Sequence, residues 1–429
     1  MKGAAVTRAC IIVAVWVAAG CSLDREGLRQ PGGEAGVPTD AAFDAAFDAR
    51  APAPDADGVD GGPSTDARPP GDSGPRPDSG VDPLSMVAVT AGLGHTCALR
   101  SDGAVFCWGD DAAGQLGDGS SGGMSETPSR VPLPEPATAI GSGGDFTCAV
   151  VRSGSLHCWG GNGSGQLGDG STTDRPSPVL IVGGAVRAGG GASHGCFVGL
   201  SGGISCAGLN DEGQLGVSGG DRSSHEMVAG LSAAGAVTGG ALHTCAIAGG
   251  QVHCWGGNSE GQLGDDSTSG RSSPEAVPGL SGVTALAAGD LHTCAVHGLG
   301  TSCWGKGGDG RLGHGSTSDA RLPVLVTGLT DARDVGAGVD HTCALHTDGA
   351  VSCWGKNDRS QLGPGTSDGS RSTPVRVPDL NATALAVGGS HACVIQGGEV
   401  WCWGRNNKRQ LGTAGGDRAA PQRVPGLPE

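Results

Sequence analysis

Two cysteines that stand nine or ten residues apart recur seven times along the chain, and this repetition constrains the fold more than any other feature. The first cysteine of each copy is residue 97, 148, 196, 245, 294, 343 or 393, so successive copies begin 48 to 51 residues apart. A regular period of this length predicts a repeat architecture in which each copy forms one structural unit.

Each copy carries four short segments with the composition of β-strands. They are alternating or β-branched runs, such as VTALAAG at 283–289 and SPEAVPGL at 273–280, bounded by Gly, Asn, Asp and Ser. Four strands in each of seven units predict an all-β fold, a seven-bladed β-propeller over residues 86–429. A parallel β-solenoid is the alternative, but its rungs are usually shorter and do not each contain a hairpin.

The lengths of the connections suggest where each blade begins and ends. Only Ser281 and Gly282 separate VPGL from VTALAAG, which favours a tight hairpin, whereas the loop containing GQLGDDSTSG is long enough to cross between blades. We therefore predict that each blade takes its proline-containing strand from the preceding copy. The last such segment, 421–427, is then expected to complete the blade of Cys97 and Cys107 and close the ring.

The turn between the two cysteines of each copy determines whether their sulfur atoms can meet. CAIAGGQVHC has a two-residue turn, Gly249-Gly250, and CALRSDGAVFC has a three-residue loop that ends on Gly103. Both turns place the cysteines opposite each other. Counted from the two-residue turn, Cys245 and Cys254 fall at a non-hydrogen-bonded pair, where Cα atoms approach to about 4.5 Å, within disulfide range. The predicted disulfides are Cys97–Cys107, Cys148–Cys158, Cys196–Cys206, Cys245–Cys254, Cys294–Cys303, Cys343–Cys353 and Cys393–Cys402.

Two other uses of paired cysteines fit the sequence less well. Zinc sites favour cysteines two to four residues apart and need four ligands, whereas each copy offers two. A redox site favours C-x-x-C, which the sequence lacks. We therefore expect no metal site, and we expect an oxidising compartment in which the disulfides form.

The first 20 residues have the features of an export signal. Lys2 and Arg8 precede the apolar run ACIIVAVWVAAG, which is too short to span a bilayer comfortably. The run ends at Ala18-Ala19-Gly20-Cys21, which resembles the lipobox of bacterial lipoproteins, where signal peptidase II cuts before a cysteine that is lipidated. The resemblance implies that Cys21 carries lipid and that Ser22 favours sorting to the outer membrane or cell surface. Plain secretion or a signal anchor is the alternative.

Residues 21–85 are rich in Pro, Gly, Asp and Ala and have no hydrophobic periodicity. From Ser22 to Ser85 the segment carries 13 acidic residues and 5 arginines, a net charge of −8. Such a segment cannot bury enough apolar surface to offset its ordering entropy, so we predict a disordered acidic linker. DADGVDG, at 55–61, lacks the spacing and the distal Glu of a calcium loop.

The copies resemble the repeat of the regulator of chromosome condensation (RCC1) family. The first copy shows the matching motifs as GLGHTCAL, DGAVFCWG and GQLG, and the resemblance covers residues 86–429. It implies a seven-bladed propeller. Copies vary, with Phe146 in place of His, Ala207 in place of Trp and Arg311 in place of Gln, which affects the packing of single blades.

The repeated His and Trp residues belong to these motifs, which favours structural roles. We expect each His to be semi-buried and to bond to neighbouring backbone within its blade, not to bind metal. The residues are His95, His194, His243, His292, His341 and His391. We expect each Trp to pack between blades, not to stack a ligand. The residues are Trp108, Trp159, Trp255, Trp304, Trp354 and Trp403.

Composition and motifs narrow the range of functions. The net charge of −16 argues against binding a nucleic-acid backbone. The sequence contains no P-loop, H-E-x-x-H or convincing nucleophile elbow, so we expect neither catalytic residues nor a cofactor. An enzyme whose site the motifs do not reveal is the remaining catalytic interpretation.

Function is therefore expected in the loops that differ between copies. We predict an exported, non-catalytic, monomeric scaffold that engages a protein or glycan and meets the membrane only through its lipid anchor. The family resemblance allows two alternatives, guanine-nucleotide exchange and a secreted enzyme inhibitor.

Overall fold

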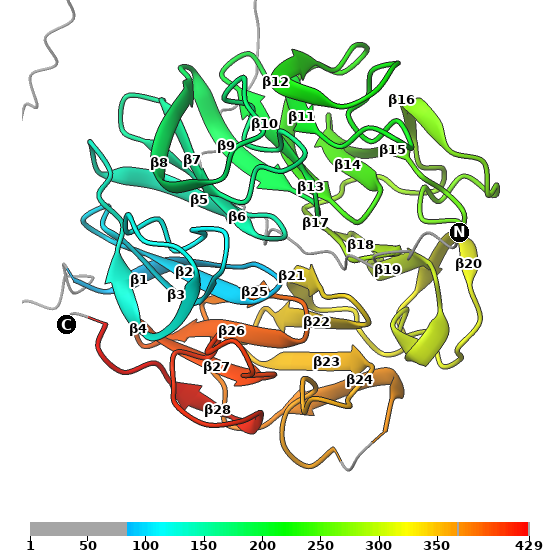
Figure 1. Ribbon diagram of the computed structural model, residues 1–429. Helices are drawn as coiled ribbons and strands as arrows, with labels where there is room; N and C mark the ends of the chain where they lie inside the picture. The colour runs from blue at the N-terminus through cyan, green and yellow to red at the C-terminus, as the bar shows by residue number, and fades with distance from the viewer. Residues whose placement is uncertain (1–83, 367–368, 428–429) are drawn as a thin grey trace, which may run out of the picture. The chain divides into compact units, whose positions relative to one another are not determined.

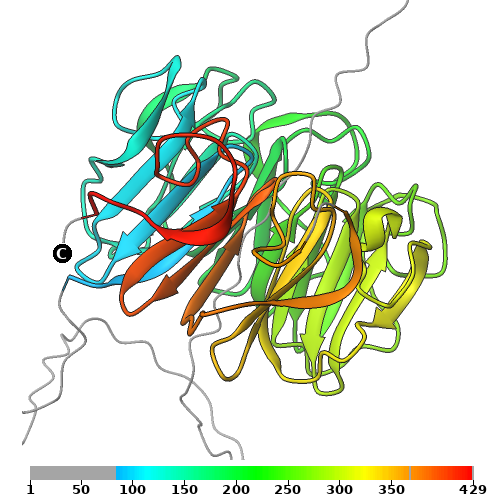
Figure 2. The same cartoon turned by 90° about the horizontal axis from the view of Figure 1, so that it is seen from below.

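Seven four-stranded antiparallel sheets, arranged in a ring, make up the computed structural model, which describes residues 84–366 and 369–427 (Figure 1). Each sheet is one blade, and the chain builds blades 1 to 7 in sequence order. The first strands of neighbouring blades contact each other around the centre, and those of blades 1 and 7 also meet. The side view shows the blades twisting outward from this centre (Figure 2).

The strands of all blades fall into four classes by their place in the sheet. The innermost strands are β1 (Met86–Ala91), β5 (Ala137–Ser142), β9 (Ala185–Gly190), β13 (Ala234–Gly239), β17 (Ala285–Ala288), β21 (Ala332–Ala337) and β25 (Ala384–Val387). The second strands, which hold the first cysteines, are β2 (His95–Arg100), β6 (Phe146–Val151), β10 (His194–Gly199), β14 (His243–Ala248), β18 (His292–His297), β22 (His341–His346) and β26 (His391–Gln396).

The other two classes lie further out. The third strands, which hold the second cysteines, are β3 (Val105–Asp111), β7 (Leu156–Gly160), β11 (Ile204–Gly208), β15 (Gln251–Gly256), β19 (Gly300–Gly305), β23 (Val351–Gly355) and β27 (Glu399–Gly404). The outermost strands are β4 (Gly123–Arg130), β8 (Arg175–Val182), β12 (Arg222–Met227), β16 (Arg271–Ala276), β20 (Ala320–Leu325), β24 (Arg371–Val377) and β28 (Arg418–Arg423). The one helix of the described residues is the short 3₁₀ turn η1 (Gly308–Gly310).

The predicted fold class, a seven-bladed all-β propeller, is confirmed. The expected signal peptide, the lipidation site Cys21 and nearly all of the acidic linker lie outside the described residues. Within the described residues, no helix is both long and apolar enough to cross a membrane.

The predicted exchange of outermost strands between copies is wrong. Every outermost strand pairs within its own copy, and the C-terminal strand β28 pairs with β27, not with the blade of Cys97 and Cys107. The segment 277–284 shows the reason. Val277 N–H bonds to the Val252 carbonyl and Val283 N–H bonds to the Gly250 carbonyl, so the segment crosses the end of its own blade instead of forming a hairpin.

The connection lengths permit this crossing. Eight extended residues span about 26 Å, whereas the three strand spacings from the outermost to the innermost position cover about 14 Å. A short connection therefore does not require adjacent strands. The longer GQLG loop joins the third and fourth strands of one blade, although it packs against the next blade.

All seven predicted disulfides are present, and each joins the second and third strands of one blade. Cys245 and Cys254 are register partners, with Cα atoms 4.1 Å apart, and Ala248 pairs with Gln251 next to the turn. In the copies with longer turns, Gly103 has φ of 88°, the left-handed conformation that the three-residue loop requires. Register explains why turns of both lengths leave the sulfur atoms opposite each other.

The hydrophobic core lies mostly between blades. Trp108 of blade 1 packs with Leu411 and Val424 of blade 7, and Trp304 of blade 5 packs with Leu263 and Val277 of blade 4. The six repeated tryptophans are fully buried. The predicted packing role of these residues is confirmed, and burial of this aromatic surface contributes to holding neighbouring blades together.

Candidate interaction site

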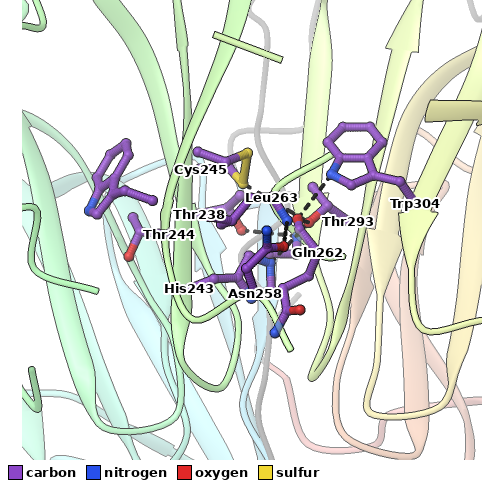
Figure 3. Close-up of a disulfide and its surroundings, with 12 residues drawn as sticks. Thr238, His243, Thr244, Cys245, Asn258, Gln262, Leu263, Thr293 and Trp304 are labelled. Carbon is purple, nitrogen blue, oxygen red and sulfur yellow. Dashed lines mark hydrogen bonds between the residues drawn. A yellow bond between two sulfur atoms is a disulfide. The ribbon is translucent and has the colours of Figure 1, made fainter. Parts of the chain in front are cut away.

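One backbone carbonyl at each of six blade interfaces accepts a hydrogen bond from the next blade. It belongs to the Gln of a Q-L-G sequence, which is GQLG in blades 1, 3 and 4, SQLG in blade 6 and RQLG in blade 7, or to Arg311 in blade 5. The donor is the indole N–H of the next blade's Trp, at 2.8 to 3.0 Å. Figure 3 shows Trp304 directed at Gln262 in this way. The loop conformation that presents the carbonyl is fixed by a side chain, because Asn258 Oδ1 accepts the N–H of Leu263.

The residue that follows the repeated His adds a second bond to the same carbonyl at four interfaces. Thr96, Thr244, Thr293 and Thr342 donate their hydroxyl protons to it at 2.7 to 3.0 Å. A His of the preceding blade also lies within hydrogen-bond distance of each of these Thr oxygens. We call this Trp–Thr–carbonyl–His group the interblade lock.

The lock defines the protonation of the histidines. The Thr proton is used on the carbonyl, so the Thr oxygen accepts from Nε2–H of the His, as between His243 and Thr293 at 2.9 Å. Nδ1 of His243 is then the unprotonated nitrogen, and it has no partner among the described residues. Burial lowers the pKa of this His to about 3, so the ring stays neutral near neutral pH.

The prediction of semi-buried histidines that bond within their own blade is wrong in both respects. All six are fully buried, and His95, His194, His243, His292 and His391 reach the Thr side chain of the next blade at 2.7 to 2.9 Å. The G-x-x-H motif makes room for the ring, since a Cβ on Gly240 would collide with His243. The partner lies about 50 residues away in the sequence, which explains why local reasoning misses it.

The interface between blades 2 and 3 has a different construction. Phe146 stands where the other blades have His, and Gly195 stands where the partner Thr is expected. The Phe146 ring lies against Gly190 and Gly195, in the space that a Thr side chain would partly occupy. The His donor and the Thr acceptor of the lock are therefore both missing at this one interface.

The missing Trp at the same interface is also replaced. Ala207 leaves space above Gly168, and His225 of the outermost strand β12 fills it, so that a Cβ on Gly168 would collide with the His225 ring. Its equivalent, Gly117, lies in the same way against Trp159. His225 also makes an edge contact with Phe197, with ring centroids 5.0 Å apart.

Two further departures affect the lock, one at the interface between blades 5 and 6 and one at the interface between blades 6 and 7. Arg311 keeps its carbonyl in the lock, and its guanidinium forms an ion pair with Asp340 of the next blade at 2.7 Å. Ala392 takes the Thr position in blade 7, so neither nitrogen of His341 has a partner in the described structure. Of the four groups of the lock, only Trp403 and its carbonyl remain bonded at this interface.

One position on the outermost strand, which we call the outward rim position, is cationic on some blades and apolar on others. It pairs with the residue before the second cysteine and is Arg in blades 1, 6 and 7 but Leu, Met, Ala and Leu in blades 2 to 5. The residues are Arg130, Leu180, Met227, Ala276, Leu325, Arg376 and Arg423. Three of them are large, apolar and exposed.

Hairpin tips extend this apolar surface. Leu200 and Leu299 occupy the turns between the second and third strands of blades 3 and 5, at the same end of the disc as Leu180, Met227 and Leu325. These five side chains are between 56% and 77% exposed, and we call them the apolar sector. Large apolar side chains left exposed on several blades at one end of the disc are candidates for an interaction site.

The described residues contain no group of three or more His, Cys, Asp or Glu side chains placed to hold a metal ion. Cys21 lies outside the described part, so its lipidation stays a prediction. Sequence reasoning misses the Thr and carbonyl of the lock, His225 and the apolar sector. Comparing the seven copies position by position on the outermost strand would have found the apolar sector.

This chain is a seven-bladed repeat propeller. Each blade is formed by contiguous residues, is cross-linked by one disulfide and is joined to its neighbours by interblade contacts that recur along the ring. The chain belongs to the regulator of chromosome condensation (RCC1) family. The model of the RCC1-like domain matches residues 57–342, and the RCC1 repeat matches residues 332–361, 348–395 and 397–429.

Relatives from human and plant match parts of this chain. The human probable E3 ubiquitin-protein ligase HERC3 is 37% identical over 86 residues, which are 20% of this chain and 8% of that protein. The mitochondrial RCC1 domain-containing protein RUG3 of Arabidopsis thaliana is 36% identical over 83 residues, 18% of this chain and 19% of that protein. The match thus spans under a fifth of either relative's length.

Solved structures show the same fold. Human WBSCR16 superposes with a TM-score of 0.66 at 22% identity, covering 75% of this chain and 93% of that one. Prp20p of Saccharomyces cerevisiae gives a TM-score of 0.65 at 20% identity, covering 80% and 87%. At this level of identity the likeness defines the architecture alone.

Restoring the lock between blades 6 and 7 is expected to stabilise the protein. Ala392→Thr would give His341 an acceptor and the Gln361 carbonyl a second donor, as at four other interfaces, and raise the free energy of unfolding by about 1 kcal/mol. Urea unfolding followed by tryptophan fluorescence measures the change. Ala392→Val, of similar volume without the hydroxyl, is the control. Equal effects of both substitutions would contradict the role of the hydroxyl.

The buried histidines are expected to make the propeller sensitive to acid. Burial lowers the pKa of His95, His243, His341 and His391 to about 3 and that of His194 to about 4, and places that of His292 well below 6.5. The unfolded chain binds these protons near pH 6.5 and the folded chain does not. Their stabilisation is thus complete above pH 6.5 and is lost as pH falls toward the folded values.

The loss is expected to approach about 1.4 kcal/mol per pH unit for each histidine. Asp334 opposes it, because burial raises its pKa to about 7 and protonation then favours the folded state. One group cannot offset six, so the urea midpoint should fall steeply between pH 6.5 and 4.5. A midpoint that stays constant over this range would contradict the assignment of neutral histidines.

Proposed function

We propose that this protein is a non-catalytic, protein-binding scaffold that is tethered to the bacterial cell surface through lipidated Cys21. The observation that carries the proposal is the apolar sector. The outward rim position is Arg on blades 6, 7 and 1 but large and apolar on blades 2, 3 and 5, although it has the same register in every blade. A monomer would gain solubility from charged residues here, so exposed Leu and Met favour a partner.

The chemistry of the sector favours a protein over a glycan. Its five side chains are aliphatic Leu and Met, whereas sugar rings typically stack on exposed aromatic faces. The six repeated tryptophans of this chain are buried in the blade interfaces. Met is common at protein-binding surfaces because its flexible side chain adapts to irregular partners.

The disulfides support a location outside the cytosol. All 14 cysteines of the described residues are paired, and such bonds persist in oxidising compartments. A cytosolic or nuclear GTPase would not meet the protein there, so the scaffold function takes precedence over guanine-nucleotide exchange. Inhibition of a secreted enzyme is one form that partner binding can take.

The apolar sector can be tested with two matched double variants. Leu200→Ser with Met227→Ser removes two exposed apolar side chains from blade 3. Thr347→Ala with Arg376→Ser changes the equivalent positions of blade 6. We expect the first variant to lose the protein that the native chain recovers from a cell-envelope extract and the second to retain it. Equal recovery by both variants, with unchanged unfolding midpoints, would contradict the proposed surface.

The anchor has a separate test. Cells that express the native chain should incorporate labelled palmitate into it, and Cys21→Ala should abolish the label because the thiol is the acylation site. The Cys10→Ala variant is the control, since Cys10 lies within the apolar run of the signal. A label that survives in Cys21→Ala would contradict lipidation at this residue and favour plain secretion or a signal anchor.

A further inference from the structure

A single position at the loop end of the disc, opposite the hairpin tips, differs in charge from blade to blade. It is the residue two places after the tryptophan, or after Ala207 in blade 3. Its backbone N–H bonds in every blade to the carbonyl of the residue before the repeated His or Phe146, so the position has the same setting throughout. The bonds run from Asp110 to Gly94, Gly161 to Asp145, Leu209 to Ser193, Gly257 to Leu242, Lys306 to Leu291, Lys356 to Asp340 and Arg405 to Ser390.

Only blades 5, 6 and 7 carry a cation at this position, as Lys306, Lys356 and Arg405. Arg359 in blade 6 and Lys408 and Arg409 in blade 7 extend the positive charge along the same loops. Loops of blades 3 and 4 carry acids nearby, Asp211, Glu212 and Glu260. The loop end is therefore divided by charge, although the whole chain is acidic.

A cavity of about 220 Å³ lies in the cationic part, between blades 6 and 7. The side chains of Lys356, Arg359 and Arg405 line it, together with Ser390 and two carboxylates, Asp340 and Asp358. Loops that end the innermost strands of blades 1, 6 and 7 complete the lining through Leu93, Val339 and Gly389. The cavity is thus open toward the face that variable loops form.

The charges of this cavity are incompletely balanced. Asp340 makes its short ion pair, 2.7 Å, with Arg311, which does not line the cavity, and the Lys356 ammonium lies 3.6 Å from both Asp340 and Asp358. Arg359 reaches Asp417 only at 3.9 Å. Nε of Arg405 is buried and has no hydrogen-bond partner among the described residues. A buried donor without an acceptor is costly, and an anionic ligand would satisfy it.

We propose that this cavity binds the carboxylates of an acidic segment of a partner protein. The inference deepens the proposed scaffold function and rests on it. Arg405 would accept one carboxylate into the cavity, and the loop cations beyond it would meet further acidic side chains along the segment. A single small anion would neutralise only the cations of the cavity. Because the row of cations extends beyond the cavity, a peptide with several carboxylates fits it better.

Nucleic acid fits this site less well. The cavity lining contains no aromatic side chain on which a base could stack. The net charge of −16 also opposes a long polyanion. A short acidic segment places its charges on the cationic loops of blades 6 and 7 and avoids the acidic loops of blades 3 and 4.

Fluorescence anisotropy with a labelled hexa-aspartate peptide tests the site, using the full chain carrying Cys21→Ser. We expect saturable binding that weakens with salt, and no binding of the hexa-asparagine peptide. Arg405→Ala should weaken binding about tenfold, because a charge-assisted hydrogen bond is lost. Arg152→Ala removes the same charge from an exposed turn at the other end of the disc, and should change binding less than about twofold.

Three further measurements complete the test. One is a second variant of the site, and the other two compare an acidic partner segment with a nucleic acid and with the chain's own linker as the occupant of the cavity. Arg359→Ala, on a half-exposed side chain, gives a second measure if Arg405→Ala lowers stability. Equal affinities of the Arg405→Ala and Arg152→Ala variants, or tighter binding of a single-stranded oligonucleotide, would overturn the proposal. Replacing the 13 acids between Ser22 and Ser85 by amides tests the chain's own segment as occupant. Binding confined to that variant would assign the cavity to this segment and overturn a partner's role.

The two proposals can fail separately. Partner recovery that depends on the apolar sector, together with no binding of the acidic peptide, would overturn only the cationic site. Peptide binding that depends on Arg405, together with partner recovery that does not depend on the apolar sector, would overturn only the proposed docking surface.

Discussion

At six of the seven interfaces, a single backbone carbonyl governs how the blades of this propeller fit together, that of the Gln before Leu-Gly or, in blade 5, of Arg311. It accepts the indole N–H of the next blade and, at four interfaces, the Thr hydroxyl as well. Disulfides cannot replace it, because each one lies within a blade. Ring closure is also noncovalent, through Thr96 and Trp108 of blade 1 on the Gln410 carbonyl of blade 7. The relative placement of all seven sheets therefore depends on contacts made across interfaces by buried polar groups.

Local geometry explains which features the sequence can predict. Blade number, the cysteine register and the turn lengths involve residues within one copy, so spacing and hydrogen-bond alternation are sufficient. The outermost strand is predicted in the wrong blade because eight residues fit either a hairpin or an extended crossing, and only the bonds of Val277 and Val283 distinguish them. The partner of each His lies about one period away, and no pattern within a copy identifies it.

Two departures from the repeat are explained only by a second residue outside the motif that departs. Phe146 loses a donor where Gly195 has lost the acceptor, and Ala207 leaves a space that His225 fills from a different strand. Taken alone, each substitution would be expected to weaken its blade. Phe146 and Gly195 remove the donor and the acceptor together across one interface, which is less costly than losing one of them, whereas His225 fills the space of the missing Trp from within blade 3. His341 opposite Ala392 is the unpaired case.

The residues of the lock are buried, so exposed residues can differ between blades without changing how the blades pack together. The outward rim position and the residue after Trp-Gly have fixed backbone settings in every blade, so their side chains can change from Asp to Lys or from Arg to Leu at little structural cost. Exposed apolar residues lie at the hairpin end of blades 2, 3 and 5, and cations gather at the loop end of blades 5 to 7. The two surfaces lie on opposite ends and mostly on different blades. A partner, or two partners, can therefore engage them without competing for the same side chains.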